Sequence, residues 1–239
     1  NVLEVPKLPD ELEADVNSEE VSNNDVAIIT LSRISGEGKD RRKGKGDYYL
    51  SEREEEDLRY LAEMNKPVIL ILNAGGPVEL TDILEQTDNI KGILNISQLG
   101  QEGGDALADV LLGKEVPGGK LTTTWARRYE DYPASEEYGY LNGNLEKEKY
   151  KEGIYVGYRY FDSFDKKVMF PFGFGLSYTM FEMKCCSINM EESKIRAEVQ
   201  VTNTGNEYAG KEVVQIYVTL PQTELEKEYK RLAGFAKTR

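Results

Sequence analysis

The stretch Val26-Ala-Ile-Ile-Thr-Leu-Ser-Arg-Ile-Ser-Gly-Glu-Gly-Lys-Asp-Arg41 joins an apolar run to a charged loop that contains glycine. The run predicts a buried strand over 26–31, so Glu37 falls on the loop that leaves the carboxyl end of that strand. Ligands bind at that edge of open α/β sheets. Gly36 and Gly38 flank the carboxylate, and glycine lets the backbone turn sharply and lets a ligand come close. Glu37 is therefore the leading candidate for a functional side chain, although most hydrolyses need a second carboxylate, which would have to come from outside this chain.

Further apolar runs predict a second buried strand over 67–73 and a third strand over 90–96. Ser51 and Glu54 match a capping box, which predicts a helix from there to about Met64. Strands that alternate with helices indicate βαβ units and a parallel sheet. The sequence therefore predicts an α/β fold for this part of the chain.

A second helix is predicted over 101–112, with Gly113 as its C-cap and Glu102 as a carboxylate favoured by the helix dipole. Beyond it, a short strand over 122–125 places Trp125, the only tryptophan, in the core. The next stretch, 127–150, is polar and rich in tyrosine.

Only strand signals remain from residue 181 onward, with clear alternation over 194–203 and 212–220. These strands predict half of an antiparallel sandwich, because a complete one needs roughly 100 residues. Tyr155, Tyr158 and Tyr160 could stack on sugars or pack between domains, and we favour packing.

Composition excludes several mechanisms. The 239 residues contain no histidine, which removes Ser-His-Asp and Cys-His catalysis and most zinc sites. The net charge of -13 argues against a nucleic-acid or membrane partner, and no stretch has the roughly 18 apolar residues of a transmembrane helix. Cys185 and Cys186 are expected to be ordinary buried or half-buried thiols, which fits a cytoplasmic location. The first residue is Asn1, and a removed signal peptide would leave such a start, so a secreted or periplasmic location stays open.

The loop over 36–46 also invites a phosphate-binding interpretation, because it carries several cations, namely Lys39, Arg41, Arg42, Lys43 and Lys45. Its spacing matches neither Gly-x-Gly-x-x-Gly nor a Walker loop, so a solvated charged loop is the commoner reading of these residues. Cations beside Glu37 would lower its pKa, whereas a general acid needs a raised one. If Glu37 is an acid, these cations must point away or pair with Asp40 and Asp47.

Seven segments, in the same order along the chain, together resemble the C-terminal part of the glycoside hydrolase family 3 β-glucosidases. Several of them are long and uncommon, and they extend over nearly the whole chain. They are Ser32–Arg41, Gly100–Gly113, Pro117–Leu121, Glu152–Tyr160, Phe172–Thr179, Val201–Gly205 and Gly210–Val213.

This resemblance implies a barrel that carries the sugar pocket and the aspartate nucleophile, an α/β sandwich that lends the acid/base, and a fibronectin type III-like domain. The expected fold class is thus a layered α/β sandwich over 25–178, after a lead-in over 1–24, followed by an incomplete fibronectin-like β-sandwich over 179–239. The family's acid/base falls on Glu37, and nothing here matches the nucleophile segment. The chain alone would be an incomplete enzyme.

The implied activity is retaining hydrolysis of terminal β-linked glucose without a metal or organic cofactor. The implied partners are a β-glucoside or short β-linked oligosaccharide and a (β/α)8 barrel, in the same protein or a companion chain, with a homo-oligomer also possible. Two positions depart from the family: Gly118 replaces a common serine, and Ser97 stands where a tryptophan is frequent, which puts the preferred substrate length in doubt. A non-catalytic carbohydrate-binding or scaffold module is the rival interpretation.

Overall fold

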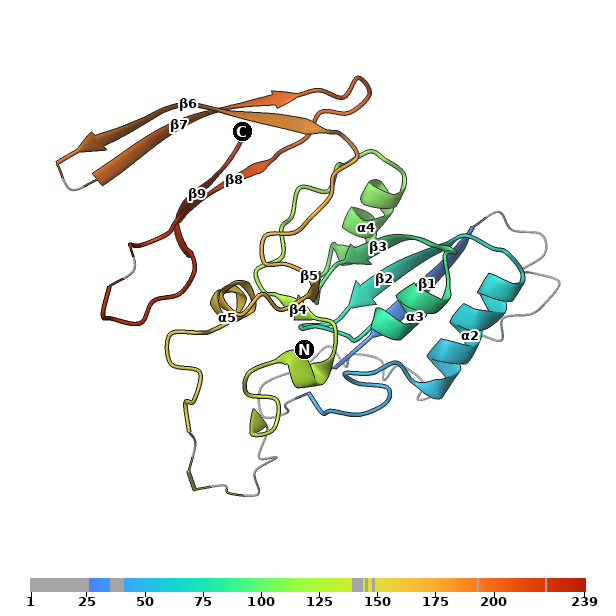
Figure 1. Ribbon diagram of the computed structural model, residues 1–239. Helices are drawn as coiled ribbons and strands as arrows, with labels where there is room; N and C mark the ends of the chain where they lie inside the picture. Colours follow the sequence, from blue (N-terminus) through green and yellow to red (C-terminus); the bar gives the residue numbers. More distant parts are fainter. Residues whose placement is uncertain are drawn as a thin grey trace, which may run out of the picture. The chain divides into compact units, whose positions relative to one another are not determined.

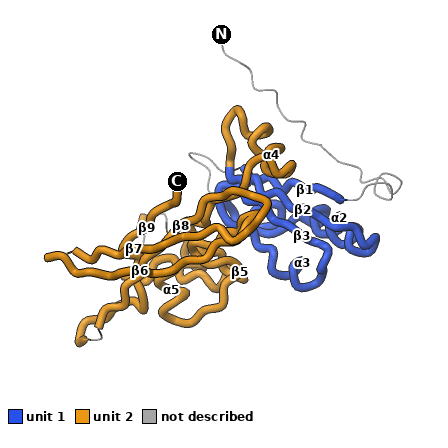
Figure 2. Tube along the Cα trace, turned by 90° about the horizontal axis from the view of Figure 1, so that it is seen from above, with its two compact units in different colours: residues 1–97 blue, residues 98–239 orange. Residues whose placement is uncertain are grey.

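A computed structural model describes residues 26–34, 41–138, 144, 146–147, 149–192, 194–221 and 223–239. The chain divides into two compact units, residues 1–97 and 98–239, which Figure 2 colours separately and which are described one at a time here. The predicted lead-in lies outside the described residues. The domain boundaries expected after residues 24 and 178 stay predictions.

The first unit is built on the parallel sheet that the sequence predicts. Its three strands are β1 (Ala27–Ser32), β2 (Val68–Asn73) and β3 (Ile90–Asn95), in the spatial order β1-β2-β3. Both strand pairs are parallel, with Leu31 opposite Leu72. All three carboxyl ends therefore lie along one edge, from which the loop after β1 leaves.

The two predicted strands β1 and β2 differ in burial. The central strand β2 is almost fully buried, as expected. The expectation of a buried strand is wrong for most of β1, since Leu31 is its one buried residue and Ile28 keeps 55% of its surface exposed. β1 is the edge strand of this sheet, and its residues alternate between a face toward the core and an exposed face.

Figure 1 shows two helices, α2 (Glu52–Glu63) and α3 (Thr81–Gln86), in front of the sheet. The first is the predicted helix: Ser51 and Glu54 form the reciprocal capping box, and Leu58 and Leu61 are buried. The sequence analysis did not predict α3, because it has six residues and Leu80 at its N-cap gives no side-chain capping bond.

The second unit begins with α4 (Gly103–Leu111), the predicted second helix, and Gly113 adopts the expected left-handed conformation with φ of 71°. Two short strands, β4 (Trp125–Ala126) and β5 (Val168–Phe170), pair antiparallel. Trp125 is 3% exposed and packs edge-on against Phe170, which confirms its place in the core. The remaining elements here are the 3-10 turn η1 (Tyr129–Asp131) and the helix α5 (Tyr158–Ser163).

The last four strands form two antiparallel pairs, as the alternation predicts. They are β6 (Phe181–Glu191) with β7 (Lys194–Asn203), and β8 (Val213–Val218) with β9 (Arg231–Lys237). The fibronectin-like assignment of these strands stays a prediction.

The expected burial of the two cysteines is wrong, because both are exposed. Cys185 and Cys186 lie at a bulge of β6, a strand that among the described residues pairs with β7 alone. Within the described part of the chain, no helix is long and apolar enough to cross a membrane.

Candidate active site

The segment that carries Glu37, residues 35–40, lies outside the described residues, so the assignment of Glu37 stays a prediction. Both of its flanks are described. Arg33 and Ile34 precede the segment at the carboxyl end of β1, and Arg41 follows it. The candidate site is therefore built here from the structure at the two ends of this segment.

Arg33 is the most heavily bonded side chain at this edge. It is 5% exposed, although arginine is seldom buried unless it is paired. Its Nη1 and Nη2 each lie 2.7 Å from an oxygen of Glu54, a bidentate ion pair. The remaining three N–H groups donate to the backbone oxygens of Ser32 at 2.9 Å, Asp47 at 2.7 Å and Tyr49 at 3.5 Å. All five donors of the guanidinium are thus used.

Glu54 links this arginine to the start of α2. Its Oε2 accepts the backbone N–H of Ser51 at 2.7 Å, while both of its carboxylate oxygens accept from Arg33. Burial by itself would raise the pKa of the Glu54 carboxyl, but the hydrogen bonds and charge of Arg33 and the bond from Ser51 lower it overall. The glutamate that caps α2 therefore also holds the Arg33 guanidinium in place.

Asp47 joins the two flanks of the undescribed segment. Its backbone oxygen accepts from Nε of Arg33 at 2.7 Å and from Nη2 of Arg41 at 2.6 Å. Its carboxylate pairs with Nε of Arg41 and accepts the backbone N–H of Arg42 at 2.7 Å. Burial alone would raise the pKa of the Asp47 carboxyl, but the Arg42 N–H and the Arg41 guanidinium lower it overall.

Arg41 is also tied to the loop that follows the neighbouring strand. Its Nη1 donates to the backbone oxygen of Pro77 at 3.1 Å, in the loop after β2. The expected pairing of a loop cation with Asp47 is confirmed for Arg41. Lys45 pairs with Glu52 at 3.1 Å, so neither of these two cations supports the phosphate-binding interpretation.

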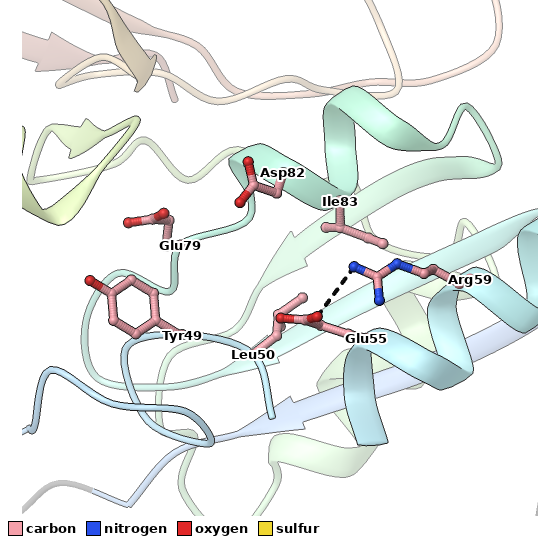
Figure 3. A pocket seen from close by; sticks show the side chains of 7 residues that line it. All are labelled: Tyr49, Leu50, Glu55, Arg59, Glu79, Asp82 and Ile83. Atoms are coloured by element: carbon pink, nitrogen blue, oxygen red, sulfur yellow. Dashed lines mark hydrogen bonds and ion pairs between the residues drawn. The ribbon is translucent and has the colours of Figure 1, made fainter. Parts of the chain in front are cut away.

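Figure 3 shows a pocket near this edge, and three of its seven lining side chains are acidic. Arg59 on α2 forms an ion pair with Glu55 at 3.2 Å within it. Across the described ranges, no three cysteine, aspartate or glutamate side chains gather to hold a metal ion. We assign the pocket no chemistry. Its lining residues are Tyr49, Leu50, Glu55, Arg59, Glu79, Asp82 and Ile83.

The tyrosines that could have formed a sugar platform pack inside the second unit instead. Tyr155 and Tyr160 lie 4.8 and 5.1 Å from the ring of Phe164, and Tyr158 lies 5.0 Å from that of Phe172. These ring contacts are packing contacts within one unit, while packing between domains stays a prediction. Glu102 is the N-cap of α4 and makes no side-chain capping bond.

The second unit also contains a half-buried ion pair, between Lys120 and Glu212. Nζ of Lys120 is 2.8 Å from Oε1 of Glu212 and donates to the backbone oxygen of Gly175 at 2.6 Å. Glu212 also accepts the backbone N–H of Val213 at 2.6 Å, at the start of β8. This contact brings together three of the segments on which the family resemblance rests.

Sequence reasoning missed the role of Arg33. The available signal was the strand alternation, which places Arg33 on the same face as Ile29 and Leu31. A charged residue on the core-facing side of a strand needs partners. The capping glutamate Glu54 and the backbone of Asp47 supply them.

Comparison with known proteins identifies the family. The model for the glycosyl hydrolase family 3 C-terminal domain matches residues 7–158, more than half of the chain. The chain is 38% identical to beta-glucosidase A of Butyrivibrio fibrisolvens, over 100% of this chain and 32% of that protein. It is 36% identical to thermostable beta-glucosidase B of Acetivibrio thermocellus, over 90% of this chain and 28% of the relative.

Solved structures agree with this assignment. Beta-glucosidase 3B from Thermotoga neapolitana, in complex with glucose, superposes with a TM-score of 0.84 at 42% identity, over 92% of this chain and 31% of that one. A beta-glucosidase from Paenibacillus barengoltzii gives a TM-score of 0.86 at 37% identity, over 92% of this chain and 24% of that one. The chain thus spans less than a third of the curated relatives that it matches. Its α/β sheet with following antiparallel strands is the architecture of these enzymes' C-terminal regions, and the chain belongs to glycosyl hydrolase family 3.

Proposed function

We propose that this chain is part of a retaining, exo-acting β-glucosidase that hydrolyses terminal non-reducing β-D-glucosyl residues. Relatives that match nearly the whole chain are named beta-glucosidases, and one of the similar structures holds glucose. The substrate would be a β-glucoside or a short β-linked oligosaccharide.

The proposed catalytic machinery is divided between this chain and a (β/α)8 barrel, in the same full-length protein or in a companion chain. The barrel supplies the sugar pocket and the aspartate nucleophile. This chain supplies Glu37. The small share of each relative that the chain covers leaves room for such a barrel. A cytoplasmic location and a homo-oligomer are further proposals that the sequence allows.

In the proposed mechanism, the barrel aspartate attacks the anomeric carbon while Glu37 protonates the departing glycosidic oxygen. Glu37 then deprotonates the water that releases glucose from the covalent intermediate. A retaining mechanism requires the two carboxyl groups to lie about 5–5.5 Å apart during the reaction. The chemistry calls for neither a metal nor an organic cofactor.

One observation carries the role of Glu37 within this proposal. The segment that holds Glu37 leaves the carboxyl edge of a parallel sheet, and both of its flanks, at Arg33 and Arg41, are bonded to Asp47. Ligands bind at this edge in open α/β sheets.

The test is azide rescue of the full-length enzyme that carries Glu37→Ala, with an activated aryl β-glucoside as substrate. We expect turnover to collapse because the covalent intermediate has lost its general base. Azide, which needs no base, should restore turnover and yield a glycosyl azide of retained configuration. Near-normal turnover by the variant would favour the rival interpretation, a non-catalytic carbohydrate-binding or scaffold module.

A further inference from the structure

The described residues at the two ends of the Glu37 segment form a closed network, which we call the loop clasp: Arg33, Arg41, Asp47 and Glu54. Arg33 and Arg41 bracket the segment in the sequence, with seven residues, 34–40, between them. Both donate to one atom, the backbone oxygen of Asp47, at 2.7 and 2.6 Å. The clasp thus joins the start of the segment to its end.

Two guanidinium groups on one carbonyl oxygen repel each other, so the arrangement persists only if their charges are balanced. The Asp47 carboxylate balances Arg41, and Glu54 balances Arg33 through two bonds of 2.7 Å each. The clasp is therefore neutral as a whole, with two cations and two anions. The charged pairs also satisfy their polar partners, which a buried network must do to be stable.

The clasp is anchored to three rigid parts of the first unit. Arg33 continues from β1, and its N–H donates to the backbone oxygen of Asn73 on β2 at 3.0 Å. Glu54 belongs to the capped first turn of α2. Arg41 reaches the backbone of Pro77 after β2 at 3.1 Å. The start of the segment is thereby fixed to the sheet and to α2, and its end is fixed to the loop that follows β2.

We propose that Asp47 and Arg41 are positioning residues for Glu37, and that the loop clasp fixes where this segment begins and ends so that the carboxyl group is delivered to the glycosidic oxygen. This inference rests on the proposed function of Glu37. A carboxyl group displaced by about 1 Å from its productive position can cost on the order of a hundredfold in rate. A clasp whose only role was stability would affect every substrate alike.

The dependence on the leaving group separates these two roles. A general acid accelerates the departure of a poor leaving group, such as the sugar of cellobiose, and contributes little when dinitrophenolate leaves. The ratio kcat/KM reports the steps up to the first irreversible one, which include this departure. Mispositioning of Glu37 should therefore lower kcat/KM for cellobiose and spare kcat/KM for 2,4-dinitrophenyl β-glucoside.

The test uses the full-length enzyme with Asp47→Asn, which removes the charge that pairs with Arg41 and keeps the backbone oxygen. We expect kcat/KM for cellobiose to fall by on the order of ten- to a hundredfold. The value for the dinitrophenyl glucoside should stay within about twofold of the wild type. The matched control is Asp57→Asn, the same substitution in an exposed pair with Arg53 at 3.0 Å on α2, which should leave both values unchanged.

A second variant, Arg41→Lys, keeps the positive charge but cannot bond to Asp47 and Pro77 together, because lysine lacks the planar fork. This variant should also lose kcat/KM for cellobiose and keep kcat/KM for the dinitrophenyl glucoside, even if Asp47→Asn fails to fold. Equal losses on the two substrates, or no loss, in a folded variant would overturn the positioning role.

Glu37→Ala, measured in the same assays, separates the two proposals. If Glu37→Ala shows the split between substrates and the clasp variants do not, the positioning role alone is wrong. If Glu37→Ala shows neither the split nor azide rescue, the proposed function of Glu37 is wrong, and the positioning role fails with it.

Discussion

Arg33 in the first unit and Lys120 in the second each place a cation against a glutamate away from water, yet they are bonded differently. Arg33 spends five donors on a bidentate carboxylate and three backbone oxygens around the ends of the Glu37 segment. Lys120 contacts Glu212, which directly precedes β8, and one backbone oxygen, that of Gly175. A rigid fork fixes direction, whereas an ammonium group on a flexible stem mainly supplies charge.

The two ion pairs therefore suggest different roles within one chain. The Arg33 network lies where the position of a nearby carboxylate would decide the rate. The Lys120 pair joins segments far apart in the sequence, in a unit to which we assign no catalytic residue. We therefore expect both to stabilise the fold, and only the first to influence the dependence on the leaving group.

The largest effect on stability is expected for Arg33→Met. The variant leaves the Glu54 carboxylate without its bidentate partner and the backbone oxygen of Asp47 with one donor fewer. Breaking a buried ion pair by removing one partner costs about 3 kcal/mol or more, and the partial exposure of Glu54 places this case at the lower end. Urea unfolding of the full-length enzyme, followed by circular dichroism, measures the loss.

Arg53→Met is the matched control for this variant. Arg53 makes an exposed ion pair with Asp57 on α2, the helix that also carries Glu54. Surface pairs contribute about 0–1 kcal/mol, so the control should unfold close to the wild type. Similar unfolding midpoints for the two variants would contradict the importance given to the Arg33 network.

A smaller effect is expected for Lys120→Met. Its partners keep some compensation, because Glu212 still accepts the N–H of Val213. We expect a loss of about 2 kcal/mol, since a half-buried carboxylate and a carbonyl lose a charged donor. The folded variant should keep the wild-type ratio of kcat/KM between cellobiose and 2,4-dinitrophenyl β-glucoside. A changed ratio would remove the contrast between the two ion pairs.

The pH dependence of stability gives the smallest of the three effects. The pKa values of Asp47 and Glu54 are lowered in the folded protein, so their contribution to stability is complete above the unfolded values near 3.8 and 4.5. It is lost as the pH falls through the lowered folded values. Glu54→Gln should therefore flatten the decline of the unfolding midpoint below about pH 4.5. An unchanged slope in this variant would show that the Arg33–Glu54 pair is not the source.

The extent to which the sequence predicts this molecule depends on whether a signal is local. The parallel strands and α2 follow from patterns within a few residues, such as the capping box of Ser51 and Glu54. The burial of β1 was overestimated, because an apolar run does not tell an edge strand from a central one. The helix α3 gave no signal, since packing rather than capping holds so short a segment.

The candidate site could likewise be predicted from the sequence only in part. Glu37 was a candidate from its place after the first predicted strand, and its acid/base role came from the resemblance. The need for a carboxylate to neutralise Arg41 came from elementary electrostatics. The partnership of Arg33 with Glu54 could not be predicted as a pair, because their contact spans 21 positions and depends on how α2 packs against the end of β1. The exposed cysteines were missed because a two-stranded pairing covers little of β6.

The role of Glu37 is best tested by a crystal structure of the full-length enzyme, trapped as its 2-deoxy-2-fluoroglucosyl intermediate. We expect the Glu37 carboxyl group to lie about 5–5.5 Å from the carboxyl group of the nucleophilic aspartate, with both flanks of its loop held by Asp47. A different acidic side chain at that distance, with Glu37 outside the sugar pocket, would show that Glu37 is not the acid/base.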